Sequence, residues 1–311
     1  MGSDAHVIVL GGPRSLALEA QHRIEDLERR WSRFDERSEV STLTRDAGRA
    51  VVVSPETLEL VERALAAWKM TGGRFDPTVL GALTRAGYDR SFDELGAHAA
   101  AGTSPLATGA AGIEIVANTV RLPVGVGFDP GGIGKGLAAD IVVDELRAEG
   151  AAGVCVNLGG DLRVDGESPT GGAWTIAVDH PEYAHPLAHI GLARGAVATS
   201  TTLRRRWEVA GEVRHHLIDP KTARPSASDL TFVTVVAGYA WMAEVLAKAV
   251  LLHGSPKHFS ILSGTGAAAL AVDDTGGFSA SLEFDEYVAE RMHPSVARER
   301  IPARRELATA S

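Results

Sequence analysis

The apolar residues of the first quarter of the chain recur at helical spacing in two segments. Residues 15–31 carry an apolar stripe between Glu and Arg side chains, formed by Leu16, Ala20, Ile24, Leu27 and Trp31. Residues 55–70 carry a second stripe, formed by Leu58, Val61, Leu65 and Trp68. This spacing predicts two amphipathic helices. Ser54 and Pro55 suit the start of the second helix, and Gly72-Gly73 suits its end.

Short apolar runs over the rest of the chain predict strands. They are HVIVL, the hairpin IEIVANTVRLP with Asn118 at its turn, GVCVNLGG, WTIAVD, GAVATST, TFVTVVA and ALAVDD. A further helix is expected after a glycine-rich loop, with Leu137, Ile141 and Leu146 on one face and Gly150 at its end. Helices mixed with many short strands favour an α+β fold. We expect one domain over residues 1–292 and a charged tail over residues 293–311.

Composition excludes some classes of function. The chain has 311 residues and a formal net charge of −9, which disfavours nucleic acid as a partner because phosphate backbones are bound by clustered Lys and Arg. The short basic run Arg204-Arg205-Arg206 is interpreted as a solvated strand or loop. Cys155 is the single cysteine, so no intrachain disulfide can form. We interpret it as a small buried hydrophobic residue in a protein from a reducing compartment.

The sequence gives no signal for a membrane. No segment approaches the roughly 18 consecutive apolar residues of a membrane span. The N-terminal stretch MGSDAHVIVLGG lacks a basic segment and a long apolar segment, so it does not resemble a secretory signal. We therefore expect a cytoplasmic protein with no membrane partner, although MGS also resembles a remnant of cloning.

The glycine-rich stretch FDPGGIGKGLAAD, residues 128–140, is a candidate phosphate site. A glycine turn that opens a helix exposes backbone N–H groups at the positive end of the helix dipole, and Lys135 adds a movable charge. Two standard motifs do not fit. A P-loop needs Ser or Thr where Gly136 stands, and the dinucleotide fingerprint needs Gly where Leu137 stands. On spacing alone, a phosphate site and a merely tight loop are equally good interpretations.

Three other stretches carry weaker signals. VNLGGDLRVDG, residues 156–166, is typical of a β-turn at a strand end. RHHLIDPKTARP, residues 214–225, places two adjacent histidines on opposite faces of a strand, and a structural histidine is favoured over a catalytic one. TGGRFDPTV, residues 71–79, is another glycine turn, with an Asp before Pro.

The stretch AEVLAKA, residues 243–249, lies in a long apolar run that nevertheless carries Glu244 and Lys248. On an exposed helix, such a pair contributes about 0.2–0.5 kcal/mol. A helix that is apolar all round is expected to be buried, however. Because buried charges are costly unless they are well satisfied, the pair is weak evidence for a stabilising role and a candidate for a functional site.

Six stretches resemble, in order, the sequence blocks of the ApbE family, the FAD:protein FMN transferases. They are MGSDAHV, FDERSEVSTL, GGRFDPTV, DPGGIGKGLAAD, NLGGD and HHLIDPKTARP. The resemblance extends from Met1 to about Asp274, and the order and spacing of the blocks carry it. It implies an α+β, T-fold-related fold of mixed helices and antiparallel sheets, with FAD in a cleft between lobes.

Members of this family transfer FMN from FAD to a Ser or Thr hydroxyl of an acceptor protein and release AMP. By position, the resemblance implies FAD contacts from Met1, Phe34, Arg74, Phe75, Asp76, Asp129, Lys135 and Ile218. Phe34 stands where the family often has Tyr, so an aromatic face is kept and a hydroxyl is lost. His216 aligns with the family histidine before Ile-Asp-Pro. Its neutral imidazole could take the proton of the incoming hydroxyl, or only position the cofactor.

The resemblance also implies Mg²⁺ at the diphosphate, with Gly132, Glu244 and Ala247 at the positions of its ligands. Glu244 replaces an Asp, and Lys248 replaces a Thr that contributes to the family's site. A charged ammonium has only donors and cannot bind a metal. Two hypotheses stay open. Lys248 could pair with Glu244 and replace the cation as a catalytic group, or the altered site could bind FAD without transfer.

The leading hypothesis is therefore an FAD:protein FMN transferase that acts on a protein acceptor. A related alternative is an FAD pyrophosphate hydrolase, which would use water as the acceptor and yield FMN and AMP. An alternative from another class is a non-catalytic FAD-binding protein. Glu244 and Lys248 favour this alternative, because they alter the expected metal site.

Overall fold

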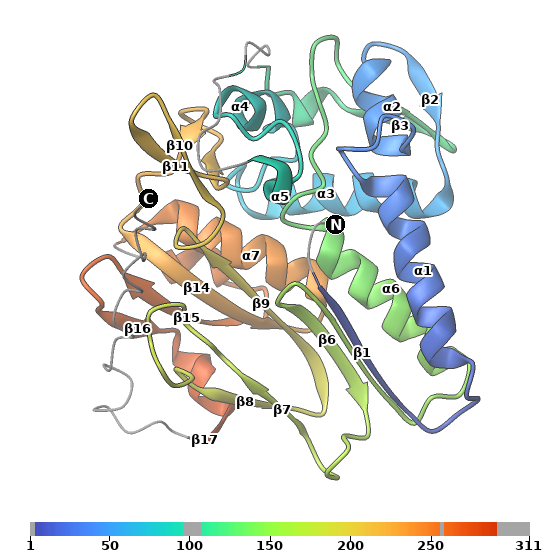
Figure 1. Ribbon diagram of the computed structural model, residues 1–311, viewed down its shortest axis with the longest axis vertical. Helices are drawn as coiled ribbons and strands as arrows, with labels where there is room; N and C mark the ends of the chain where they lie inside the picture. Colours follow the sequence, from blue (N-terminus) through green and yellow to red (C-terminus); the bar gives the residue numbers. More distant parts are fainter. Residues whose placement is uncertain (1–3, 96–101, 103–106, 256–257, 291–311) are drawn as a thin grey trace, which may run out of the picture.

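The computed structural model, drawn in Figure 1, describes residues 4–95, 102, 107–255 and 258–290. Met1 and the expected tail over residues 293–311 lie outside the described residues. Helices and antiparallel strands are mixed along the chain, which confirms the predicted α+β class. Within the described part, no helix combines the length and the apolar character that crossing a bilayer requires.

The centre of the molecule is a seven-stranded sheet with the order β1-β5-β6-β9-β14-β15-β16. Its strands are Ala5–Leu10 (β1), Gly153–Leu158 (β5), Asp161–Gly166 (β6), Arg194–Thr201 (β9), Leu230–Ala237 (β14), Ala268–Asp273 (β15) and Phe278–Ala280 (β16). All neighbouring strands are antiparallel. Strands β5 and β6 form a hairpin whose turn is Gly159-Gly160, and both glycines have positive φ angles.

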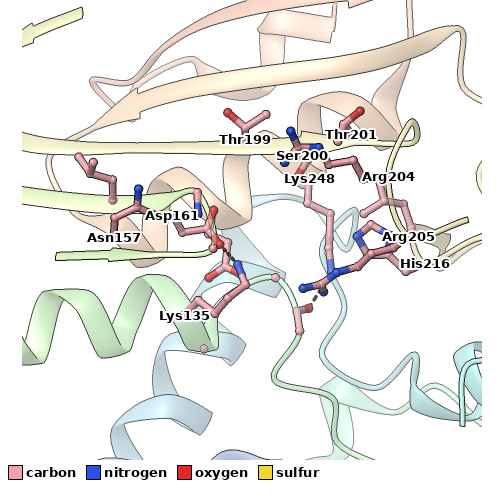
Figure 2. A pocket seen from close by; sticks show the side chains of 18 of the residues that line it. Lys135, Asn157, Asp161, Thr199, Ser200, Thr201, Arg204, Arg205, His216 and Lys248 are labelled. Carbon is pink, nitrogen blue, oxygen red and sulfur yellow. Dashed lines mark hydrogen bonds and ion pairs between the residues drawn. The ribbon is translucent and has the colours of Figure 1, made fainter. Parts of the chain in front are cut away.

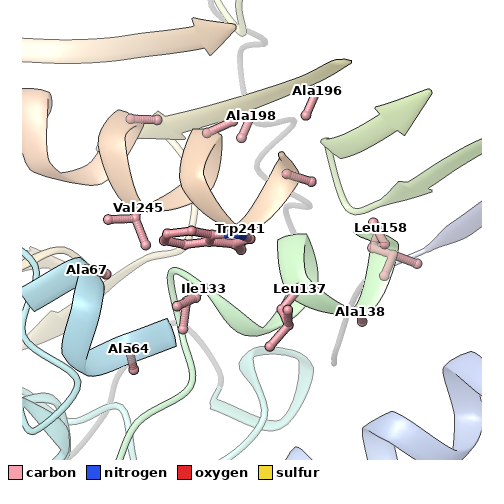
Figure 3. Packing of buried hydrophobic residues seen from close by; sticks show 14 of the residues in the cluster. Ala64, Ala67, Ile133, Leu137, Ala138, Leu158, Ala196, Ala198, Trp241 and Val245 are labelled. Atoms are coloured by element: carbon pink, nitrogen blue, oxygen red, sulfur yellow. The ribbon is translucent and has the colours of Figure 1, made fainter. Parts of the chain in front are cut away.

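Three helices cover one face of this sheet: α1 (Leu16–Trp31), α6 (Gly134–Ala148) and α7 (Ala240–His253). Helix α7 is buried on nearly every side, as its apolar sequence predicts. Figure 3 shows Trp241 and Val245 of α7 in the core with Ile133 and Leu137. Ala64 and Ala67 of the neighbouring helix α3 (Pro55–Met70) belong to the same core.

A second lobe, beside the main sheet and its three helices, consists of α3 and several short elements. They are α2 (Glu39–Arg45), β2 (Ala50–Val52), α4 (Leu80–Arg85), α5 (Phe92–Leu95), the 3-10 turn η1 (Ala110–Gly112), β3 (Glu114–Val116) and β4 (Thr119–Arg121). Strands β3 and β4 form the predicted hairpin beside β2. The side chain of Ser54 accepts a hydrogen bond from the backbone N–H of Thr57, which confirms the predicted start of α3.

The opposite face of the main sheet is covered by a small sheet with the order β17-β8-β7. Its strands are Trp174–Ala177 (β7), His189–Leu192 (β8) and Val288–Glu290 (β17). Two hairpins lie between β9 and β14: β10 (Arg206–Val209) with β11 (Glu212–His215), and β12 (Ile218–Asp219) with β13 (Arg224–Pro225). The 3-10 turns η2 (His258–Leu262) and η3 (Leu282–Glu286) complete the described elements.

A buried carboxylate joins α6 to α7. The Asp140 oxygens accept hydrogen bonds, both 2.9 Å, from the N–H groups of Ala240 and Trp241 at the start of α7. The Nε atom of the buried Arg163 lies 3.1 Å from Asp140 Oδ1. Burial raises the pKa of Asp140 to about 7, and the two backbone N–H groups and Arg163 oppose this rise. Gly136 allows the close approach, because a Cβ atom there would lie 2.4 Å from the carbonyl oxygen of Ala240.

Asp140→Ala is expected to lower the free energy of unfolding by about 3 kcal/mol, because it leaves two buried N–H groups without their acceptor. Urea denaturation followed by circular dichroism at pH 5.5 measures the change. Asp144→Ala, at an exposed position of the same helix, is the matched control and should change stability by less than about 0.5 kcal/mol. Equal effects of the two substitutions would contradict the role of Asp140.

The stability difference between wild type and Asp140→Ala should narrow as the pH rises from 5.5 to 8. The pKa of Asp140 is about 7 in the folded protein, above its ordinary value of 3.8. Between these values the folded state keeps a proton that the unfolded state has released, so stability falls with rising pH. Urea titrations at intervals across this range measure the trend. A difference that widens toward pH 8 would contradict it.

Candidate active site

A cavity of about 670 Å³ lies where the main sheet meets the second lobe. Its walls come from the start of β1, the end of α1, the glycine loop before α6, the β5–β6 turn, the end of β9 and α7. Figure 2 shows Lys135 and Lys248 extending into this region, with Arg205 and His216 near Lys248. Segments distant in sequence therefore place four basic side chains around one space.

Lys135 connects two buried carboxylates on the cavity wall. Its ammonium forms an ion pair with Asp161 at the start of β6, and it donates a hydrogen bond of 3.2 Å to Glu244 Oε1 on α7. Glu244 Oε2 accepts a second bond, of 2.8 Å, from the backbone N–H of Gly136. Because both oxygens of Glu244 have partners, its burial is well satisfied.

The side chain of Lys248, on α7, binds the glycine loop rather than Glu244. Its Nζ donates a hydrogen bond of 2.7 Å to the carbonyl oxygen of Gly131. Gly132 has a φ of 99°, and a Cβ atom there would lie 2.3 Å from Lys248 Nζ, so glycine leaves the space that the ammonium occupies. Burial lowers the pKa of Lys248, while the charges of Asp129 and Glu244 oppose this shift.

His216 follows β11 and lines the cavity. Its Nδ1 is buried and has no hydrogen-bond partner within the described residues. Burial, followed by the positive charges of Arg205 and Lys248, holds the pKa of His216 well below 6.5. The neighbouring His215 has a structural role, because its Nε2 lies 3.1 Å from the carbonyl oxygen of Ser226. Only His216 of the pair lines the cavity, in keeping with the predicted opposite orientations.

An aromatic group with a central arginine lines the part of the cavity formed by the end of α1. The guanidinium carbon of Arg33 lies 4.4 Å from the ring centroids of both Phe34 and Tyr88. Arg33 Nε also lies 3.5 Å from Asp129 Oδ1. The nearly buried Arg33 therefore organises the predicted FAD contacts Phe34 and Asp129. Sequence reasoning missed Arg33, whose only signal was its position next to Phe34.

The predicted site residues divide into two groups. Those that line the cavity are Phe34, Asp129, Gly132, Lys135, His216, Glu244 and Lys248. Those outside its lining are Arg74, Phe75, Asp76, Ile218 and Ala247. Two residues of the second group bind nearby backbone: Arg74 donates to the carbonyl oxygen of Leu252 at 3.2 Å, and Asp76 accepts from the N–H of Thr78 at 2.7 Å.

The cavity also contains polar residues that sequence reasoning did not assign to it. They include Asn157, Asp161, Thr199, Ser200, Thr201, Arg204 and Arg205. Residues 204–206 form a loop that enters β10, with Arg204 and Arg206 exposed, as predicted. Arg204 and Arg205 also line the cavity, which the sequence did not indicate. The block NLGGD held the signal for Asp161, but a β-turn accounted for that block equally well.

A model of the ApbE family matches residues 1–271 of the chain. The chain belongs to the ApbE family. Among solved structures, the ApbE protein of Thermotoga maritima is similar, with a TM-score of 0.83 and 27% identity over 93% of this chain and 97% of that one. The structural match and the family model confirm the resemblance that the six sequence blocks indicated.

Two of the curated relatives named FAD:protein FMN transferase show how far the similarity extends. The one from Vibrio cholerae is 26% identical over 297 residues, which cover 92% of this chain and 86% of the relative. The one from Treponema pallidum is 31% identical over 254 residues, which cover 72% of this chain and 67% of the relative. The similarity thus extends over most of the length of each protein.

The side chains at the expected metal position do not fit an open Mg²⁺ site. Mg²⁺ requires near-octahedral oxygen ligands. Both oxygens of the expected ligand Glu244 already accept hydrogen bonds, and the carbonyl of Gly131, next to the expected Gly132, accepts one from Lys248. Ala247 has no side-chain oxygen. No group of three or more His, Cys, Asp or Glu side chains suited to a metal occurs in the described part of the chain.

The imidazole of His216 should titrate below pH 6.5 in the free protein, because burial and neighbouring cations disfavour its charged form. NMR titration of the ring C–H signals, with His216→Gln to assign the resonance, measures the midpoint. As the pH falls through 6.5, the unfolded chain takes up this proton before the folded protein does. The free energy of unfolding of wild type should therefore fall more over this range than that of His216→Gln. A midpoint at or above 6.5 would contradict the expected burial effect.

Proposed function

We propose that this chain is an FAD:protein FMN transferase. The observation that carries the proposal is one cavity that combines a neutral imidazole, His216, with the ammonium groups of Lys135 and Lys248. The cations can bind a diphosphate, and the imidazole can accept a proton. Membership of the ApbE family and the names of the curated relatives support FAD as the source of the diphosphate.

The proposed reaction is a single phosphoryl transfer. The hydroxyl oxygen of an acceptor Ser or Thr attacks the phosphorus on the FMN side of the diphosphate. The bond from that phosphorus to the bridging oxygen breaks, and AMP leaves with the bridging oxygen and its electron pair. The hydroxyl proton passes to His216, which is neutral and can receive it. Lys135 and Lys248 stabilise the negative charge that develops on the phosphate oxygens.

Arg33, Phe34 and Tyr88 provide an apolar and cationic surface suited to a planar ring system of FAD. Asp129, held near Arg33, can accept hydrogen bonds from the ring or a ribose hydroxyl. The hydroxyls of Thr199, Ser200 and Thr201 line another wall. The partners in this proposal are FAD and an acceptor protein. The expected cytoplasmic location stays a prediction, which fractionation of the native cells tests.

His216→Gln should lower the rate of transfer about 10²–10⁴-fold, the usual contribution of a general base, while FAD affinity changes less than about threefold. Stopped assays measure covalent flavin on the acceptor and AMP in solution, and flavin fluorescence measures binding. The matched control is His22→Gln, an exposed position on α1, which should leave both quantities unchanged.

The same assay separates the alternatives. AMP release that does not need the acceptor protein would indicate an FAD pyrophosphate hydrolase. Tight FAD binding without either product would indicate a non-catalytic FAD-binding protein. Full transfer activity in His216→Gln would remove His216 from the mechanism, although it would leave the transferase assignment intact.

A further inference from the structure

The ammonium of Lys248 lies between α7 and the glycine loop, at the position where a divalent metal would need free oxygen ligands. The carbonyl oxygen of Gly131 accepts a 2.7 Å hydrogen bond from Lys248 Nζ. The oxygens of Glu244 accept from Lys135 Nζ at 3.2 Å and from the Gly136 N–H at 2.8 Å. Each of these oxygens already accepts a hydrogen bond, and the positive charges of Lys135 and Lys248 beside them repel a divalent cation.

The geometry around Lys248 is specific to an ammonium. Nζ lies 5.7 Å from the centroid of the Phe75 ring, within the range of a cation–π contact. Burial lowers the pKa of Lys248, and the charges of Asp129 and Glu244 oppose this shift and favour the ammonium form. The missing Cβ atom of Gly132 leaves room for the ammonium, since a Cβ there would lie 2.3 Å from Nζ. The loop therefore accommodates Lys248 at close range.

The ammonium of Lys248 is suited to a diphosphate, which carries about two negative charges near neutral pH. Lys135 lines the same cavity, where its own charge is shared with Asp161 and Glu244. An ammonium has three N–H donors. Lys248 uses one of them on Gly131, which leaves two to direct at phosphate oxygens. Arg205 lines the same cavity and adds positive potential to this region.

We propose that Lys248 replaces the divalent metal, so that this site binds FAD and cleaves its diphosphate without Mg²⁺. This inference rests on the proposed function and concerns the same cavity. The ammonium of Lys248 neutralises the phosphate under attack, and Lys135 neutralises the charge that appears as the bond to AMP breaks. Because the ammonium belongs to the protein, FAD can bind without a metal ion binding first.

The experiment measures FAD affinity and FMN transfer in about 5 mM EDTA and in about 5 mM MgCl₂. NaCl is added so that the two buffers have the same ionic strength and screen charges equally. For wild type, the dissociation constant of FAD and the transfer rate should each agree within about twofold between the two conditions. Lys248→Met should weaken FAD binding about tenfold or more in both conditions, because it removes a charge-assisted hydrogen bond.

Two variants control for folding and for charge. Lys248→Arg keeps a cation and should bind FAD more tightly than Lys248→Met, although its planar group does not reproduce the geometry of an ammonium. Lys69→Met removes an exposed lysine of α3 and should match wild type. Circular dichroism and thermal unfolding establish that each variant is folded before binding is compared.

Tightening of wild-type FAD binding by tenfold or more in MgCl₂ would overturn the inference, as would FMN transfer that requires Mg²⁺. Normal FAD binding by folded Lys248→Met would also overturn it. The binding measurements decide the question even if no transfer is seen. Absence of transfer in both EDTA and MgCl₂ would contradict the proposed function, and with it metal-free cleavage, while metal-independent FAD binding through Lys248 would still stand on the binding data.

Discussion

The contact between Asp140 and the start of α7 sets the geometry of the site. Helices α6 and α7 run in opposite directions, and Asp140 fixes their relative position by accepting the N–H groups of Ala240 and Trp241. Glu244 lies one turn along α7 and meets the N–H of Gly136. Lys248 lies a further turn along and meets the carbonyl of Gly131. Residues four apart share one face of a helix, so one buried carboxylate determines where both charged side chains lie.

The buried charges of this region satisfy one another in a way that serves binding more than stability. Lys135 holds Asp161 and Glu244, so neither carboxylate is left alone in a nonpolar setting. Replacing buried ion pairs with apolar residues is often neutral or stabilising in other proteins. Their presence beside a cavity of about 670 Å³ therefore indicates a role toward a ligand. The same positive surroundings, added to burial, keep His216 in the neutral form that proton transfer requires.

Local sequence signals predicted the elements well and the site only in part. Helices α1 and α3, the β3–β4 hairpin and the apolar character of α7 followed from periodicity and from turn or capping residues. Residues such as Arg204 and Arg205 could not be placed on the cavity from composition, because a basic loop looks the same whether it faces solvent or a ligand. Their position depends on how β9 crosses the sheet, which is a nonlocal property.

The partners of Glu244 and Lys248 illustrate the same limit. Their spacing of four suggested a pair with each other, yet each has a closer partner across the α6–α7 contact. The family resemblance predicted that both residues lie in the site. Their actual hydrogen-bond partners could be identified only from the three-dimensional structure. Ala223 is a smaller example. Its φ of 53° lies in the left-handed region, for which glycine is better suited.

A crystal structure of the FAD complex grown with Mg²⁺ tests the central claim most directly, namely that protein ammonium groups meet the diphosphate in place of a metal. We predict that Lys248 Nζ stays on the Gly131 carbonyl and lies about 2.7–2.9 Å from a phosphate oxygen, with no metal ion between Glu244 and the diphosphate. A Mg²⁺ ion bound to Glu244 and to a phosphate oxygen, with Lys248 displaced from the glycine loop, would contradict the claim.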